Sequence, residues 1–301
     1  KAILVEHLGY SSHNDELKAR LWEEWKVDSL GSQWHDFDEV FIWSVSCGLV
    51  IEKLRKEKEH AYVHAHEWMS GGAIFHMKTQ KIPNTSTVFT THATMLGRAL
   101  SGHGENLIEV QDKIDPRKKA YELGVQTKYL FEQALAKNAD CFTTVSELTG
   151  EEAKLFYGKE ADVYLYNGFD NRGLEDPEEL VVQYSEANKK IENLVQGYFH
   201  DFQNINSDKS QYFYISGRNE VRNKGCDLVI ESLSQLNEEL KSKEDSKTVV
   251  AFILLMVGEF DKNQEIFNSL ENFKKKTKRE EEKQAPLSTH YMPEENEIIS
   301  L

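Results

Sequence analysis

Short runs of apolar and β-branched residues alternate along the chain with longer stretches in which apolar residues recur at helical spacing. The short runs predict strands at residues 2–6, 61–65, 87–91, 141–145, 163–166, 212–216 and 249–257. The longer stretches predict helices at residues 38–56, 118–136, 147–156, 226–240 and 264–276. Strands that alternate with helices in this way predict an α/β fold with parallel sheets.

A polar, helix-prone stretch at 186–210 separates the strands into two blocks, the second of which opens at Tyr212. The chain has 301 residues, of which 39% are apolar, and this is enough for two ordinary domains with a core each. We therefore predict one domain at 1–205 and a second at 206–301. Because the run at 2–6 reads as a strand with no initiator methionine before it, we expect that Lys1 is not the natural start.

The chain is acidic, with a formal net charge of −15. This charge repels phosphate polymers and anionic lipid surfaces, so it argues against nucleic acid and membrane partners, whereas a neutral polysaccharide is compatible with it. No apolar run approaches the roughly 18 residues of a membrane span. The cysteines are three in number, far apart and without CxxC spacing, which predicts a reducing cytoplasm and neither a disulfide framework nor a zinc knuckle.

Two histidines close the strand predicted at 61–65. Side chains alternate along a strand, so His64 and His66 face the same side. A zinc or iron site would need further ligands, for which His60, His92 or Glu67 would have to converge. The histidine pair alone leaves metal binding open.

Polar residues also follow the other predicted strands. His92 and Arg98 come after the strand at 87–91, and the carboxyl edge of a parallel sheet is where ligands bind. In the second block, Arg218 ends a strand and Lys224 lies beside the start of the helix at 226–240. A guanidinium and an ammonium next to a helix N-terminus suit a phosphate group, although a surface turn held by ion pairs explains them equally well. Asn167 is compatible with a simple turn.

These strand-end motifs, in this order and spacing, resemble those of the eukaryotic-type glycogen synthases. Residues 64–68 read HAHEW, residues 89–98 read FTTHATMLGR, and residues 139–146 read ADCFTTVS. In the second block, Gly217, Arg218, Glu220 and Lys224 fall at the fixed positions of a segment similar to the family's GRxExxNKG signature. The resemblance runs from about residue 3 to the end of the chain and implies a GT-B fold, in which two Rossmann-like parallel-sheet domains face a cleft. The second domain is incomplete.

The chain also departs from the family pattern. The glycine-rich loop that follows the family's first strand would lie before Lys1, and the segment with its paired glutamates would lie beyond Leu301. We therefore expect the chain by itself not to be a competent enzyme. Tyr166 stands where the family has a proline before Asn167. The mixed-charge region at 274–283 is shorter than the arginine-bearing helices of regulated members, which makes control by glucose 6-phosphate doubtful.

The resemblance implies a retaining glycosyltransferase that moves glucose from UDP-glucose to the non-reducing end of an α-1,4-glucan such as glycogen. It gives Arg218 and Lys224 to the diphosphate, with Gly217 and Glu220 in the same signature. It gives Arg98 the role of stabilising the donor or the closed cleft. It gives His92 to the glucose hydroxyls or, through its backbone carbonyl, to the reacting face, with His66 and Asn167 as further binding residues. It implies no metal or other cofactor, a homo-oligomer, and a cytoplasmic location. A metal-dependent hydrolase built on His64, His66 and His92, and a non-catalytic glucan-binding protein of the same fold, remain as alternatives.

Overall fold

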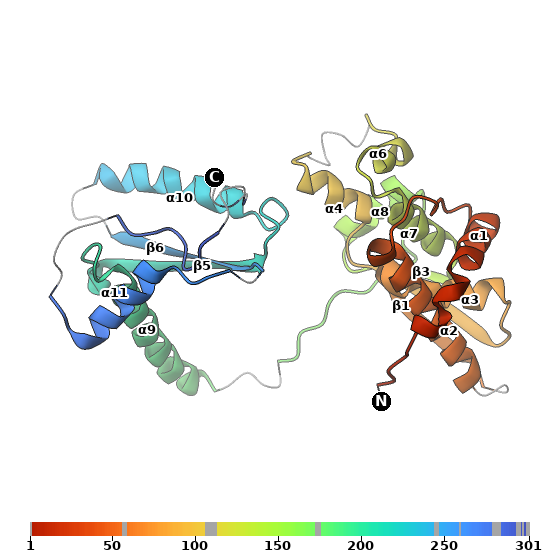
Figure 1. Ribbon diagram of the computed structural model, residues 1–301, viewed down its shortest axis with the longest axis horizontal. Helices are drawn as coiled ribbons and strands as arrows, with labels where there is room; N and C mark the ends of the chain where they lie inside the picture. The colour runs from red at the N-terminus through yellow and green to blue at the C-terminus, as the bar shows by residue number, and fades with distance from the viewer. Residues whose placement is uncertain are drawn as a thin grey trace. The chain divides into compact units, whose positions relative to one another are not determined.

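The computed structural model describes residues 2–55, 59–105, 113–171, 176–243, 247–258, 260–278, 284–292, 296 and 298. Figure 1 shows the chain as a ribbon, and its contacts divide it into two compact units, Lys1–Phe169 and Asp170–Leu301. The boundary predicted at 205/206 lies further along the chain, after α9 (Pro177–Phe199). The reason for the difference is that α9 packs on α11 (Gln264–Lys275) and so belongs to the second unit.

The first unit contains a parallel sheet in the strand order β1-β2-β3-β4. Its strands are β1 (Ala61–His66), β2 (Thr85–Thr91), β3 (Cys141–Thr144) and β4 (Val163–Tyr164). Its helices are α1 (Asn14–Trp25), α2 (Glu39–Leu54), α3 (Glu67–Thr79), α4 (Met95–Gly102), α6 (Pro116–Glu122), α7 (Gln126–Asn138) and α8 (Glu147–Tyr157), with a short 3-10 helix at Leu8–His13 and a π-helical turn at Trp34–Asp38. The α/β class and the parallel pairing predicted from the sequence are confirmed.

Two close helix contacts hold the layer of α2, α3 and α7 together. A Cβ atom at Gly72 would lie 2.7 Å from the backbone nitrogen of Val45 in α2, and one at Gly71 would run into Leu135 of α7. Gly72 N also donates to Ser44 Oγ at 3.0 Å. These glycines therefore serve helix packing and not the approach of a ligand. The main hydrophobic core of this unit includes Phe41, Phe75, Phe89, Phe131 and Phe142.

The second unit is smaller and is built on two parallel strands, β5 (Ser210–Arg218) and β6 (Thr248–Met256). Figure 1 shows α10 (Cys226–Lys241) along one side of this pair and α9 with α11 on the other. A 3-10 turn at Ser207–Lys209 leads into β5. None of the helices in the described ranges is long and apolar enough to cross a membrane.

Two sequence expectations differ from the structure. Residues 2–6 form no strand: they have no pairing partner in the described sheet, and Leu4 is 99% exposed. The single helix expected at 118–136 is two helices, because the chain turns at Gly124, whose φ of +69° favours glycine. The mixed-charge region at 274–283 falls partly outside the described residues.

Candidate functional site

Three histidines meet at the carboxyl edge of the first sheet. β1 and β2 are parallel and pair His66 with Thr90, so both strands end at this edge and His92 follows at once. His66 Nδ1 and His92 Nε2 share a hydrogen bond of 3.0 Å. The rings of His64 and His66 stack with centroids 4.2 Å apart, and His64 Nε2 bonds Thr90 Oγ1 at 2.6 Å. The structure therefore brings together the three histidines that the sequence singled out.

Glu67 fixes the backbone at this edge. Its Oε1 accepts a hydrogen bond of 2.7 Å from the backbone N–H of His92. Its own φ is +62°, which is uncommon for a residue with a side chain and marks local strain at the junction of β1 and α3. Such strain persists only where the surroundings hold it, and it accumulates at functional sites.

The His64 ring of this cluster is poorly suited to hold positive charge. Burial, followed by the neighbouring rings of His66 and His92, lowers the pKa of His64. Within the described ranges, no group of three or more His, Cys, Asp or Glu side chains is placed to hold a metal ion. The His66–His92 hydrogen bond also occupies two of the nitrogens that a metal would need.

The first turn of α4 carries Arg98 and is held from several sides. Thr94 caps the helix by accepting from Gly97 N at 3.0 Å, and its hydroxyl donates to Glu152. Met95 N donates to Glu132 Oε2 at 2.9 Å. Arg98, three residues after Met95, is half-buried, and its guanidinium favours the charged forms of both glutamates. Two carboxyl groups therefore hold the turn of α4 that carries Arg98.

The sequence analysis did not single out Glu132, although the structure places it in this network. Its side chain is fully buried, and desolvation raises its pKa to about 8. Tyr157 donates to Glu132 Oε2 at 2.6 Å, while Glu132 Oε1 is buried without a hydrogen-bond partner. A signal was present in the sequence: Glu132 lies three residues from Tyr129 and from Leu135, both buried, and so inside the apolar stripe of α7.

Asn167 follows the fourth strand of the same sheet. Leu165 N donates to Thr144 O at 2.8 Å, which continues the pairing of β3 and β4 just before Asn167. Tyr166 OH bonds Glu147 at 3.3 Å at the start of α8. Asn167 is exposed in an irregular segment beyond these contacts.

A second group of predicted residues lies in the second unit, between β5 and α10. Arg218 Nη2 forms an ion pair of 2.9 Å with Glu220, and Lys224 N donates to Glu220 O at 2.9 Å. A Cβ at Gly217 would lie 3.2 Å from the Cγ atom of Lys224. Gly225, which follows Lys224 directly, precedes α10 with a φ of +68°. The structure thus brings Gly217, Arg218, Glu220 and Lys224 together.

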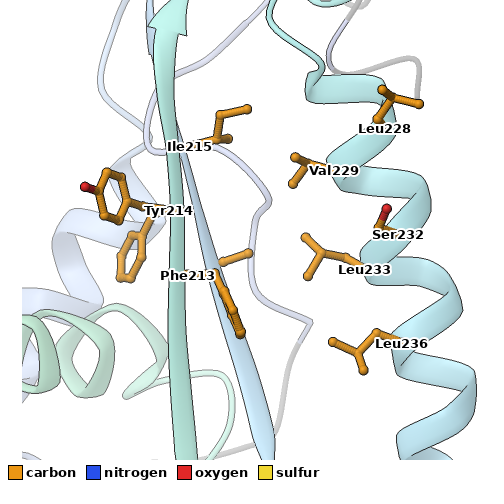
Figure 2. A pocket seen from close by; sticks show the side chains of 10 residues that line it. Phe213, Tyr214, Ile215, Leu228, Val229, Ser232, Leu233 and Leu236 are labelled. Atoms are coloured by element: carbon orange, nitrogen blue, oxygen red, sulfur yellow. The ribbon is translucent and has the colours of Figure 1, made fainter.

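A cavity of about 310 Å³ lies between β5, β6 and α10 of the same unit but does not suit a charged ligand. Figure 2 shows Val229, Leu233 and Leu236 pointing from α10 toward β5, and Phe213 and Ile215 border the same space. None of its lining residues carries a charge. A diphosphate would lose its hydration there without gaining a partner.

The glycogen synthase family model matches residues 1–294. The chain belongs to the glycogen synthase family. It is similar to glycogen [starch] synthase isoform 1 of Saccharomyces cerevisiae, at 34% identity over 90% of this chain and 39% of the relative. Isoform 2 of the same yeast is 33% identical over 85% of this chain and 36% of the relative. The human liver enzyme, glycogen [starch] synthase, is 31% identical over 84% of this chain and 36% of the relative.

This match confirms the family predicted from the strand-end motifs. It covers both groups of residues described above, since both lie before residue 294. The chain spans less than two-fifths of the length of these relatives.

Proposed function

We propose that the full-length protein containing this chain transfers glucose from UDP-glucose to the non-reducing end of an α-1,4-glucan with retention of configuration. Membership of the glycogen synthase family carries this proposal, because the match includes both strand-end groups. The two units are the acceptor-side domain and the first part of the nucleotide-sugar domain of a GT-B enzyme. The full-length protein is a cytoplasmic homo-oligomer.

The diphosphate is bound by Arg218 and Lys224. Negative charge grows on the leaving nucleotide diphosphate as the anomeric bond breaks, and fixed cations stabilise it. Both side chains are exposed, and the N-terminus of the 16-residue helix α10 follows Gly225 beside them. Aligned peptide dipoles add to the attraction of an anion at such a terminus. Glu220 orients Arg218 through their ion pair, and Gly217 leaves room for the stem of Lys224.

The donor glucose is bound at the histidine edge of the first sheet. His92 meets the reacting sugar, and its hydrogen bond to His66 holds the ring in place. Arg98 stabilises the donor from α4, and Asn167 adds a polar side chain after β4. The imidazole and amide groups offer the directional hydrogen bonds that sugar hydroxyls need, and Arg98 adds a charged donor.

The reaction proceeds without a metal ion in this proposal. Two cations and a helix N-terminus take the part that a divalent metal plays at other diphosphates. Loss of either cation costs about 2 to 4 kcal/mol of transition-state stabilisation, which corresponds to roughly 30- to 10³-fold in kcat.

The test uses the full-length protein and labelled glucose. Incorporation into glycogen is measured from UDP-glucose and from ADP-glucose with EDTA present. Arg218→Ala is compared with Lys241→Ala, which removes an exposed cation of α10 that pairs with Glu238. We expect transfer from UDP-glucose, its near loss in Arg218→Ala, and no change in Lys241→Ala.

The alternatives give other results. Hydrolytic activity that appears only when chelator is omitted would favour a metal enzyme built on His64, His66 and His92. Tight binding of glycogen with no transfer from either donor would favour a non-catalytic glucan-binding protein.

A further inference from the structure

Glu132 lies where three helices meet. It belongs to α7, its Oε2 accepts from Met95 N at 2.9 Å at the start of α4, and Tyr157 of α8 donates to the same oxygen at 2.6 Å. The side chain is 0% exposed. A buried carboxyl group with one oxygen unpartnered is costly, so its presence here calls for an explanation beyond packing.

We propose that Glu132 is a positioning residue, which fixes the first turn of α4, and with it Arg98, through the hydrogen bond that its carboxyl group accepts from Met95. Arg98 follows Met95 by three residues on the same helix, so a shift of the first turn moves the guanidinium as well. The inference rests on the proposed function, in which Arg98 acts on the donor.

The protonation state of Glu132 decides how it acts on Arg98. With its pKa raised to about 8, the carboxyl group is mostly neutral at neutral pH and holds Met95 without attracting the guanidinium strongly. At higher pH the carboxylate draws Arg98 toward the interior and away from the sheet edge. Transfer therefore weakens as pH rises through the pKa of Glu132.

The ionisable groups around Glu132 are consistent with this behaviour. Arg98 of α4 favours the carboxylate, and so does the Tyr157 hydroxyl of α8, whereas the charge of Glu67 at the start of α3 opposes it. Glu152 of α8 is half-buried with a raised pKa of its own, caused first by burial.

The remaining elements packed against α7 add little charge. β2 has no ionisable side chain, and β3 has only Cys141, at its opposite end. Lys118 and Lys119 of α6 pair with Glu122, and Lys119 also pairs with Glu105. Along α7 itself, Lys128 pairs with Asp36, and Tyr129 donates to a backbone carbonyl group.

The experiment follows α4 and catalysis separately in the full-length protein. Methionine methyl groups are labelled with ¹³C, and the signal of Met95 is assigned by its loss in Met95→Leu. Spectra and kcat for transfer from saturating UDP-glucose are recorded from about pH 6 to 9.5. Glu132→Gln is the test variant, and Glu151→Gln, an exposed glutamate beside Glu152, is the matched control.

We expect the Met95 signal of the wild type to titrate with a midpoint near 8 and kcat to fall in parallel. The fall reaches about tenfold one pH unit above the midpoint, where about one tenth of the carboxyl groups stay protonated. Both effects persist in Glu151→Gln and vanish in Glu132→Gln. Tyr157→Phe removes a donor to the carboxylate and moves the midpoint upward, which provides a second test if Glu132→Gln fails to fold.

A Met95 signal that titrates identically in Glu132→Gln would overturn the inference. The inference would also be overturned if the titration of the Met95 signal disappeared in Glu132→Gln while kcat of that variant kept the wild-type pH profile. If the wild type transfers no glucose at any pH, the proposed function fails, and the Met95 signal still decides whether Glu132 holds the first turn of α4.

Discussion

His66 and His92 share a hydrogen bond of 3.0 Å across the ends of two neighbouring parallel strands, although 26 residues separate them in sequence. One ring must donate and the other accept, so the tautomer of one histidine determines that of its partner. His92 therefore depends on His66 for its orientation as well as on Glu67 for its backbone.

His66→Ala should lower kcat of the full-length enzyme by roughly tenfold, since the ring of His92 loses its partner and samples unproductive orientations. His66→Asn, which can still donate or accept at this distance, should recover part of the loss. His35→Ala removes an exposed histidine of the same unit and is the control. Steady-state kinetics with UDP-glucose decide the matter; equal activity of His66→Ala and the control would mean that the pair has no role in transfer.

His64 should titrate below the ordinary histidine value, because burial and then the charges of His66 and His92 disfavour its protonation. Replacing His66 by Asn removes one of these charges, so the pKa of His64 should rise, though not fully, since burial remains. Titration of the histidine ring signals by NMR measures both values. An unchanged pKa of His64 in His66→Asn would show that the two rings do not interact electrostatically.

The sheet could be predicted because most of its strands have a recognisable local sequence pattern. β1, β2 and β3 are apolar runs bounded by polar residues, and the sequence located each to within two residues. Residues 2–6 have the same local pattern but find no neighbouring strand in the described structure, and pairing, not propensity, decides whether a strand forms. α3 was not predicted because two glycines near its start lower helix propensity, and only its packing against α2 and α7 compensates.

Gly97→Ala should destabilise the first unit by about 1 to 3 kcal/mol, as expected for overpacking a buried site. A Cβ atom there would run into the carboxyl group of Glu152 and lie 2.7 Å from Thr94 Oγ1, so it would displace the cap of α4. Urea unfolding followed by tryptophan fluorescence reports on this unit, since all five tryptophans of the chain precede Phe169. Gly9→Ala, with its nearest neighbour at 3.7 Å, is the control and should unfold like the wild type.

Gly225→Ala should weaken donor binding and cost about 1 to 2 kcal/mol of stability, because a φ of +68° is strained for any residue with a Cβ atom. The strain lies between Lys224 and the start of α10, so we expect the KM for UDP-glucose to rise. Gly31→Ala, at an open position of the first unit where an added Cβ meets nothing within 4 Å, is the control for the loss of a glycine as such. Similar KM values for the two variants would argue against a role of this turn in donor binding.

The site could be predicted less completely than the sheet. Polar side chains at the ends of strands can be recognised in a sequence, and the structure gathers those singled out here as two local groups: His66 and His92, and Arg218 and Lys224. Glu132 lies in mid-helix, where a glutamate ordinarily faces solvent, and its role becomes visible only when α4 and α8 pack over it. Tertiary contacts of this kind leave no local signature beyond a charge within an apolar stripe.

The buried glutamate also makes a prediction about stability. In the unfolded chain Glu132 titrates near 4.5 and in the folded protein at about 8, so between these values the folded state binds the extra proton. The contribution of this proton to the free energy of unfolding is therefore fully present below about pH 4.5. It is lost as the pH rises toward 8, at up to about 1.4 kcal/mol per pH unit.

Glu132→Gln abolishes this titration and keeps an acceptor for Met95 N. Its free energy of unfolding, measured in urea from about pH 5 to 9, should decline less steeply than that of the wild type, whereas the exposed Glu151→Gln should follow the wild type. Parallel curves for all three proteins would mean that Glu132 is ionised in the folded state throughout this range, and that its carboxylate, not the neutral acid, holds the first turn of α4.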